Sequence, residues 1–150
     1  MSMMPPPLPR AAKPRPTNNV DRDSTVRGTN DDATVSKLSC VELGYLKDDF
    51  VRYFVRRPVK RAPIINRGYF SRVAAMRLFL DAYLAAESEK PKQIVSLGCG
   101  FDTTVFQLKA AGQCPARYIE VDYQQVTSKK ADIIRHTECL RSLLEPLEGG

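Results

Sequence analysis

Apolar residues recur along the first half of the chain with the spacing of helices. After residue 28 they return every three or four positions, which is typical of amphipathic helices with one face in a core. The pattern predicts helices over about 29–44, 48–55 and 69–86. The last of these is apolar on most of its surface, so we expect it to be largely buried. The basic stretch VKRAPIINRG, 59–68, contains Pro and Gly and is predicted to be a loop.

The start of the chain has a different composition. Prolines recur between Pro5 and Pro16, and few apolar side chains accompany them. Such a segment cannot bury enough surface to offset the entropy lost on ordering. We therefore predict a disordered tail over 1–28, followed by a helix that Thr29 or Asn30 caps.

From residue 91 onward the spacing changes again. Short apolar runs now alternate with helical ones, and the first run is predicted to be a buried strand. The elements predicted here are, in order, a strand at 94–97, a helix that Asp102 or Thr103 caps and that runs to Ala111 before Gly112, a strand at 117–121 and a helix that Ser128 opens and Pro146 ends. Strands and helices that alternate in this way predict parallel strands joined by a right-handed crossover, and therefore an α/β fold.

The turn after the first strand, LGCGFDTT, carries the clearest chemical signal. Gly98 and Gly100 lack a Cβ, so a ligand can approach the main chain there. A dinucleotide fingerprint needs a further small residue where Thr103 stands, so pyrophosphate binding is disfavoured. S-adenosylmethionine has no phosphate, but its ribose needs an acid after the second strand. YIEVDY supplies Glu120 and, in the better position at the strand end, Asp122.

Two simpler interpretations of these residues remain open. The glycines can form a tight turn and nothing more, and Asp122 can simply cap the next helix. Arg72 lies in an otherwise apolar part of its helix, where an unpaired buried charge would be costly. It either pairs with an acid, reaches solvent along its stem, or binds the carboxylate of a ligand.

Composition narrows the range of functions. The formal net charge is +6, but the basic residues are scattered, so a solvated basic surface is favoured over a nucleic-acid interface. The cysteines Cys40, Cys99, Cys114 and Cys139 form no CxxC pair and His136 is the only histidine, so we expect no metal site. We interpret them as reduced thiols of a cytoplasmic protein, with Cys99 a small residue rather than a nucleophile. No apolar run approaches the roughly 18 residues of a membrane span.

Taken in order, INRGYFSRV, IVSLGCGFDTT and YIEVDY closely resemble the leucine carboxyl methyltransferases, and the resemblance runs from about Val26 to Lys130. Enzymes of that family use S-adenosylmethionine to esterify the C-terminal leucine of the protein phosphatase 2A catalytic subunit. The resemblance therefore implies this cofactor, this reaction and this partner. Relatives that methylate a carboxyl group of a modified tRNA base, in wybutosine synthesis, are the nearest alternative, and a non-catalytic interaction module is the third.

The resemblance also implies roles for four residues. Lys37 and Arg72 match the positions that bind the methionine carboxylate of the cofactor. Gly98 matches the glycine that makes a main-chain contact with the cofactor, and Asp122 matches the acid on the ribose. We expect no catalytic acid or base, because a terminal carboxyl with a pKa of roughly 3.5 is already ionised at neutral pH.

The fold that the resemblance implies is the Rossmann-like, S-adenosylmethionine-dependent methyltransferase fold. Its complete sheet has more strands than those predicted here, so we interpret the chain as the N-terminal part of such an enzyme. The expected organisation is the tail at 1–28, a helical cap at 29–90 and the first βαβα portion of the methyltransferase domain at 91–150.

Overall fold

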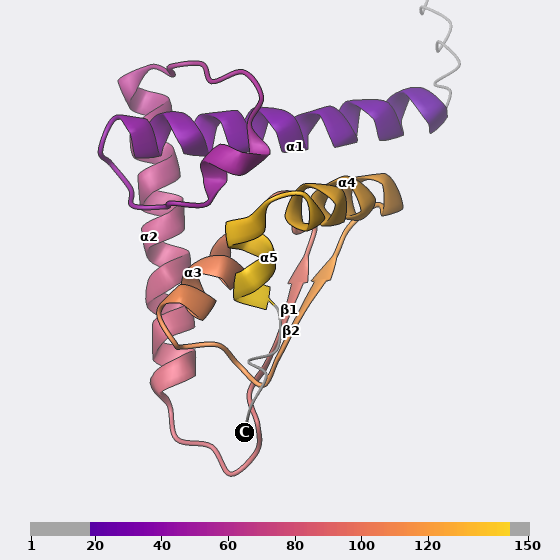
Figure 1. Ribbon diagram of the computed structural model, residues 1–150. Helices are drawn as coiled ribbons and strands as arrows, with labels where there is room; N and C mark the ends of the chain where they lie inside the picture. Colours follow the sequence, from indigo (N-terminus) through magenta and orange to yellow (C-terminus); the bar gives the residue numbers. More distant parts are fainter. Residues whose placement is uncertain (1–18, 145–150) are drawn as a thin grey trace, which may run out of the picture.

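The computed structural model describes the backbone of residues 19–144 and the side chains of residues 29–144 (Figure 1). Its elements are α1 (Asn19–Glu42), η1 (Val51–Phe54), α2 (Pro63–Ala85), β1 (Gln93–Leu97), α3 (Thr104–Ala110), β2 (Arg117–Val121), α4 (Gln124–Arg135) and α5 (Glu138–Leu144). Within this part of the chain, no helix has the length and apolar character that crossing a membrane requires.

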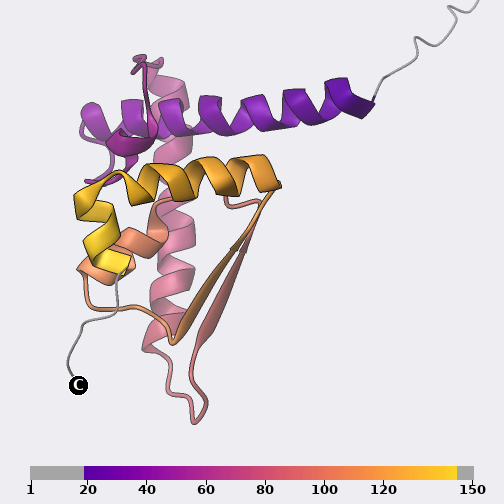
Figure 2. The same cartoon turned by 45° about the vertical axis from the view of Figure 1, so that its right-hand side comes forward.

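The two strands are parallel, and α3 lies between them in sequence, so the predicted α/β fold is confirmed. The register runs from Gln93 opposite Arg117 to Leu97 opposite Val121. α1 and α4 lie side by side across the carboxyl ends of the strands, while α2 crosses α1 and descends beside the other elements (Figures 1 and 2). The fold is that of a partial Rossmann-like domain with its helical cap placed over the strand ends, where ligands of such sheets bind.

A small aromatic and aliphatic core holds these elements together. It consists of side chains from η1, α3, α4, α5 and the glycine turn: Phe54, Phe101, Val105, Phe106, Val126 and Leu140. The ring of Phe54 lies 5.6 Å from that of Phe101 and 6.0 Å from that of Phe106, measured between centroids. Tilted aromatic contacts of this kind add to the energy gained by burial, so Phe54 of η1 connects the glycine turn to α3.

The first helix begins earlier than predicted. α1 starts at Asn19, so Thr29 and Asn30 lie inside it rather than at its cap, and the disordered tail predicted over 1–28 is wrong for residues 19–28. Extending an existing helix costs little compared with nucleating one, and no proline interrupts the sequence there. Residues 1–18 of the predicted tail lie outside the described residues.

The predicted loop at 59–68 is wrong in its second half, because α2 begins at Pro63. Proline is favoured in the first turn of a helix, where its missing N–H costs no hydrogen bond. The turn is anchored by Asn66, which is fully buried and accepts a hydrogen bond from the Ser39 hydroxyl at 3.0 Å. Its side-chain amide donates to the Arg61 carbonyl at 2.9 Å.

The last predicted helix is two helices. α4 begins at Gln124 rather than Ser128, and α5 begins separately at Glu138. The chain restarts at Thr137, whose carbonyl accepts the N–H groups of the next turn, and α5 then packs against both α3 and α4. The helical spacing of apolar residues continues across this break, so periodicity alone did not reveal it. The predicted end at Pro146 lies outside the described residues.

The burial predicted for β1 and for the helix at 69–86, which is part of α2, is wrong. Leu97 is 78% exposed and Phe79, on α2, is 76% exposed. Side chains of a strand alternate between two faces, and the helices cover only one face of this sheet. Apolar residues on the other face and along α2 have no cover among the described residues: Ile64, Met76, Leu78, Phe79, Val95, Leu97, Ile119 and Val121.

Candidate functional site

A cavity of about 390 Å³ lies at the carboxyl ends of the two strands. α1, α2, the glycine turn and the start of α4 each contribute to its wall. All four residues predicted as cofactor contacts, Lys37, Arg72, Gly98 and Asp122, line this one cavity. Residues far apart in the sequence therefore meet at the place where open α/β sheets bind their ligands.

The glycine turn has a backbone that other residues adopt at a cost. Gly98 and Gly100 have φ angles of +62° and +50°, in the left-handed region. At Gly100 there is also no room for a side chain, because an added Cβ would lie 2.4 Å from the Asn30 Oδ1 atom. Asn30 of α1 therefore contacts the turn directly. The sequence had suggested Asn30 only as the residue that begins a helix.

The main-chain N–H groups of the turn are all in use. Each one from 98 to 102 donates within the protein: Gly98 and Cys99 to the Val121 carbonyl at 2.8 and 3.3 Å, Gly100 to Asp122 Oδ2 at 2.7 Å, Phe101 to Asn30 Oδ1 at 2.9 Å and Asp102 to the Cys99 carbonyl at 2.9 Å. A phosphate needs free N–H donors. The turn lacks them, which agrees with the expectation from Thr103 that no pyrophosphate binds.

Asp122 has a structural role that the sequence did not predict. Its two oxygens accept the N–H groups of Gly100 and Tyr123, both at 2.7 Å. The residue preceding α4 is Tyr123, and no side-chain hydrogen bond caps that helix. Asp122 therefore holds the turn instead of capping the helix, and each oxygen keeps a lone pair for a further donor in the cavity.

Glu120, the other acid of YIEVDY, is engaged away from the cavity. Lys130, which is buried, donates to Glu120 Oε1 and to the Asp102 carbonyl, both at 2.6 Å. Burial raises the pKa of Glu120, and the charge of Lys130 opposes that rise. Of the two acids, Asp122 is the one that lines the cavity, as its place at the strand end predicted.

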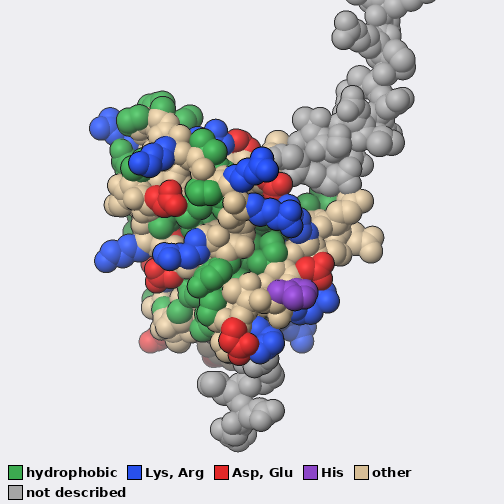
Figure 3. Space-filling model, turned by 45° about the horizontal axis from the view of Figure 1, so that its top comes forward, with side chains coloured by type: hydrophobic (Ala, Val, Ile, Leu, Met, Phe, Trp, Pro, Cys, Tyr) green, Lys and Arg blue, Asp and Glu red, His purple; other side chains and the backbone are tan. Residues whose placement is uncertain are grey.

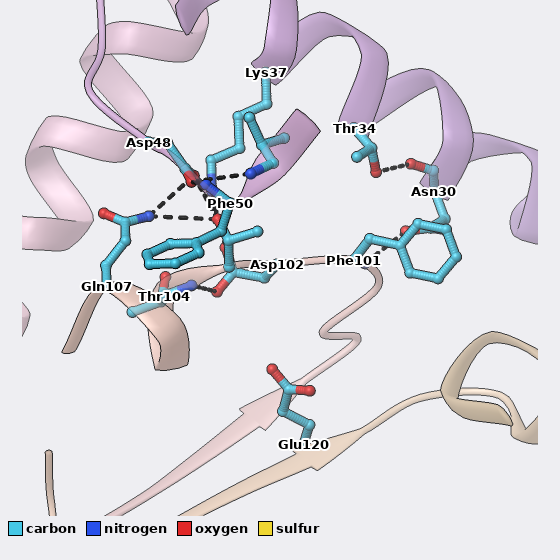
Figure 4. Close-up of polar contacts among 12 residues, drawn as sticks. Asn30, Thr34, Lys37, Asp48, Phe50, Phe101, Asp102, Thr104, Gln107 and Glu120 are labelled. Carbon is cyan, nitrogen blue, oxygen red and sulfur yellow. Dashed lines mark hydrogen bonds and ion pairs between the residues drawn. The ribbon is translucent and has the colours of Figure 1, made fainter. Parts of the chain in front are cut away.

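Lys37 is only 9% exposed, and its ammonium group is already paired (Figure 4). The Nζ atom lies 2.9 Å from Asp48 Oδ2 and 3.4 Å from Asp102 Oδ1, and it donates to the Thr103 hydroxyl at 2.6 Å. Sequence reasoning missed Asp48 and Thr103 as partners, since no motif links them to Lys37. Only the resemblance distinguished Lys37 from an ordinary surface lysine.

Asp102 is the partner of Lys37 that also lines the cavity. Burial alone would raise the pKa of this carboxyl, but the charge of Lys37 and hydrogen bonds from Thr104 outweigh it, so the pKa lies below its usual value. Asp102 is therefore ionised at neutral pH. The cavity wall therefore carries two carboxyl side chains, those of Asp102 and Asp122.

Two cations line the cavity, Lys37 and Arg72, and of these two only Lys37 forms an ion pair among the residues with described side chains. Arg72 is exposed on α2, and it makes no ion pair with any acid whose side chain is described. Of the three possibilities that its sequence context allowed, pairing with one of these acids is therefore not observed. A guanidinium free to form a bidentate contact beside a cavity is suited to a ligand carboxylate.

Nucleophilic and metal chemistry find little support among the described residues. Burial raises the pKa of the Cys99 thiol, and the nearby Glu120 carboxylate adds to the rise, which disfavours the nucleophilic thiolate. Within residues 29–144, His, Cys, Asp and Glu side chains do not gather in any group of three that could hold a metal ion. The charged side chains of Lys37, Arg72, Asp102 and Asp122 line the cavity and can bind and orient a polar ligand.

Comparison with known proteins agrees with these features. The sequence model of the family described as leucine carboxyl methyltransferase matches residues 25–142. The chain is 55% identical over 121 residues to "Leucine carboxyl methyltransferase 1 homolog" of Arabidopsis thaliana, covering 81% of this chain and 36% of that protein. It is 41% identical over 127 residues to "Leucine carboxyl methyltransferase 1" of Caenorhabditis elegans, covering 81% and 37%.

A second kind of relative matches the same region. The chain is 40% identical over 126 residues to "tRNA wybutosine-synthesizing protein 4" of Aspergillus oryzae, covering 82% of this chain but 12% of that protein. The chain thus spans little more than a third of the length of the first relatives and a much smaller part of the last one.

Proposed function

The chain belongs to the leucine carboxyl methyltransferase family, and on this premise we propose that the protein transfers the methyl group of S-adenosylmethionine to the carboxylate of a C-terminal leucine. One observation carries the proposal. The four residues that match the family's cofactor positions, far apart in sequence, line a single cavity at the carboxyl ends of the strands. The whole enzyme's substrate and partner are part of the proposal, because the chain spans only part of its relatives.

The cavity fits the chemical groups of S-adenosylmethionine. Arg72 offers a guanidinium to the amino-acid carboxylate, and Asp122 offers oxygens to the ribose hydroxyls. The carbonyl of Gly98, on the cavity wall, can accept the ammonium group. The turn has no free N–H groups between residues 98 and 102, so it favours a cationic ligand over a phosphate.

The chemistry asks for positioning and not for proton transfer. Bound S-adenosylmethionine would supply its sulfonium methyl to a carboxylate oxygen by in-line displacement, with the electrons of the broken C–S bond remaining on sulfur. The terminal carboxyl has a pKa of roughly 3.5 and needs no general base. Arg72, Lys37 and Asp122 would orient the cofactor, and α1 and α2 would exclude water from one side of the cavity.

For the acceptor, we propose the C-terminal leucine of the protein phosphatase 2A catalytic subunit. The identity of 55% with a protein named "Leucine carboxyl methyltransferase 1 homolog" supports a leucine carboxylate as the acceptor, and the phosphatase comes from the family resemblance alone. Action in the cytoplasm is part of the proposal.

The acceptor can be tested with paired peptides. The purified protein is incubated with methyl-labelled S-adenosylmethionine and a peptide that carries the phosphatase C-terminus, either as the free carboxylate or as the amide. We expect base-labile label, released as methanol, on the free carboxylate only. Equal labelling of the amide peptide, or no labelling of either, would contradict the proposed reaction.

The tRNA reaction is a second candidate, because the chain is also similar to the wybutosine-synthesizing protein. On the face shown in Figure 3, however, Lys and Arg side chains are spread among acidic and apolar ones instead of forming a continuous stripe. Binding of tRNA through phosphates would weaken steeply between about 50 and 200 mM salt. Tight, salt-sensitive tRNA binding together with an inert peptide would favour this candidate.

A non-catalytic interaction module is separated from both enzymes by calorimetry with S-adenosylmethionine. Asp122→Ala removes the proposed ribose contact, and Asp132→Ala removes a carboxylate on the exposed part of α4 as a matched control. We expect binding to be lost in the first variant and kept in the second. No binding by the unaltered protein would favour the interaction module.

A further inference from the structure

Asp48 is a buried carboxylate that the proposed reaction does not use. It is 4% exposed and does not line the cavity. One of its oxygens, Oδ1, accepts the N–H groups of Phe50 and Val51 at 3.0 and 3.1 Å, which begins η1. A buried carboxylate is costly unless its charge is compensated, so the partners of the second oxygen matter.

The second oxygen, Oδ2, links α1 and α3 to the loop that precedes η1 (Figure 4). Lys37 Nζ, from α1, lies 2.9 Å away, and the Gln107 side-chain amide, from α3, donates to it at 3.0 Å. The Thr103 hydroxyl also donates to this oxygen and in turn accepts a hydrogen bond from Lys37. Asp48, Thr103 and Lys37 thus form a closed triangle of polar contacts beneath the cavity wall.

The triangle divides the contacts of Lys37 into two kinds. Asp48 and Thr103 are buried, do not line the cavity and lie at 2.9 and 2.6 Å. Asp102 lines the cavity, its side chain is 34% exposed, and its contact with Lys37 is the longest at 3.4 Å. An ammonium has three N–H donors, so two are fixed from behind and the third, toward Asp102, faces the cavity side.

This arrangement suits a zwitterionic ligand end. Asp48 neutralises Lys37 from the buried side, which keeps an isolated lysine charge from being buried beside the cavity. Asp102 is ionised and can receive a ligand ammonium group, and Arg72 can receive the ligand carboxylate. A carboxylate placed between Arg72 and Lys37 would take the donor that Lys37 now directs to Asp102.

We propose that Asp48 and Thr103 are positioning residues, which hold the Lys37 ammonium at the cavity wall so that it and Arg72 grip the carboxylate of the cofactor's amino-acid end; the identity of that ligand rests on the proposed function. A lysine side chain loses rotamer entropy when it is fixed in one conformation. Anchoring it in advance removes that loss from the binding step.

Two ligands separate this role from a purely structural one. S-adenosylhomocysteine carries the amino-acid end, and 5′-methylthioadenosine has the same nucleoside and sulfur without it. Calorimetry on the purified protein gives the affinity for each. The matched variants are Thr103→Val, which removes the hydroxyl, and Thr103→Ser, which keeps it. Thr103 does not line the cavity, so neither substitution changes a residue of the cavity wall.

We expect Thr103→Val to bind S-adenosylhomocysteine about tenfold more weakly, as for loss of a hydrogen bond to a charged group, with methylthioadenosine affinity unchanged. Thr103→Ser should bind both ligands as the unaltered protein does. Asp48→Asn should show the same selective loss, and far-ultraviolet circular dichroism confirms that each variant is folded. If Asp48→Asn does not fold, the two Thr103 variants decide the question without it.

Two different results would overturn the inference. If the unaltered protein binds S-adenosylhomocysteine but Thr103→Val loses affinity for both ligands equally, or for neither, the triangle is structural only. If the unaltered protein binds neither ligand, the proposed function fails and the positioning role fails with it. The first result leaves the proposed function intact.

Discussion

Arg72 and Lys37 are two cations that line the same cavity, and they differ in how they are paired with acids. Lys37 is paired with two acids, whereas Arg72 makes no ion pair with any described acid. A ligand carboxylate gains more from a cation that has no partner to give up, so Arg72 should contribute more to its binding. The matching family positions do not reveal this difference, because it depends on neighbours remote in the sequence.

The first prediction concerns Arg72. Arg72→Ala should weaken S-adenosylhomocysteine binding by about tenfold or more, since a charge-assisted contact is lost. Arg67→Ala is the matched control, because Arg67 is an exposed arginine of the same helix outside the cavity. Calorimetry measures both affinities, and equal affinities in the two variants would contradict the role of Arg72.

The second prediction concerns the contact between the helical cap and the glycine turn. Gly100→Ala places a Cβ against Asn30 and should lower the free energy of unfolding by about 1–3 kcal/mol for overpacking, in addition to the left-handed strain. Gly44→Ala is the control, because Gly44 has a φ of +78° but no atom near the added Cβ. Urea denaturation of both variants separates strain from crowding. Equal losses of stability would show that the Asn30 contact does not restrict this position.

At the scale of single residues, local sequence signals indicated residues that line the cavity, but not the residues that hold them in place. Asp122 and Gly98 were predicted from a strand, a glycine turn and a terminal acid, all of which are local signals. Asp48 and Thr103 could not be predicted as partners of Lys37, because the Lys37–Thr103 contact joins positions 66 apart. Contacts of that kind depend on how α1 lies over the turn.

Some boundaries of the helices and strands were predicted from the local sequence, and others were not. β2 was predicted at 117–121 and is Arg117–Val121. α3 ends as predicted, since Gly112, with a φ of +65°, allows the N–H of Gln113 to reach the Leu108 carbonyl at 2.9 Å. The starts of α1, α2 and α4 were placed too late, because helices extend through residues with weak preferences once the rest of the helix has formed.

The third prediction concerns the β1–α3 connection and its pH dependence. Asp102 has a lowered pKa, chiefly because Lys37 and Thr104 overcome the effect of burial. A carboxyl with a lowered folded-state pKa stabilises the protein above its unfolded value of about 3.9, and that stability is lost as pH falls through the folded pKa. The stability gap between the unaltered protein and Asp102→Asn should therefore be largest near neutral pH and close below about pH 4.

Urea midpoints of the two proteins between pH 3 and pH 7 measure this gap. A gap that stays constant over the whole range would mean that the Asp102–Lys37 contact contributes nothing through its charge. A gap that widens toward acid would mean that the folded-state pKa is raised instead of lowered.

For the whole molecule, the feature that needs explanation is the apolar surface of α2 and of the uncovered sheet face. In the sequence, these residues have the apolar spacing that is typical of a buried core. The expected burial was wrong because periodicity shows which side chains are apolar and share a face. It does not show whether other described residues pack against that face. Exposed apolar side chains in such number promote association in water.

The fourth prediction follows from that surface. The 150-residue chain should associate as its concentration rises, and Leu78→Gln with Phe79→Gln should reduce this association. The melting temperature should hardly change, because both side chains are exposed and make few contacts that could be lost. Sedimentation velocity over a range of concentrations measures the effect. A chain that is monomeric at every concentration would contradict the prediction.

The central claim is that the cavity between the helical cap and the glycine turn holds S-adenosylmethionine. A crystal structure of the protein with S-adenosylhomocysteine tests it most directly. We predict the ligand carboxylate on Arg72, with Lys37 beside it, and the ribose hydroxyls on Asp122. Density for the ligand elsewhere, or a carboxylate of Asp122 that contacts only the turn while the cavity stays empty, would contradict the claim.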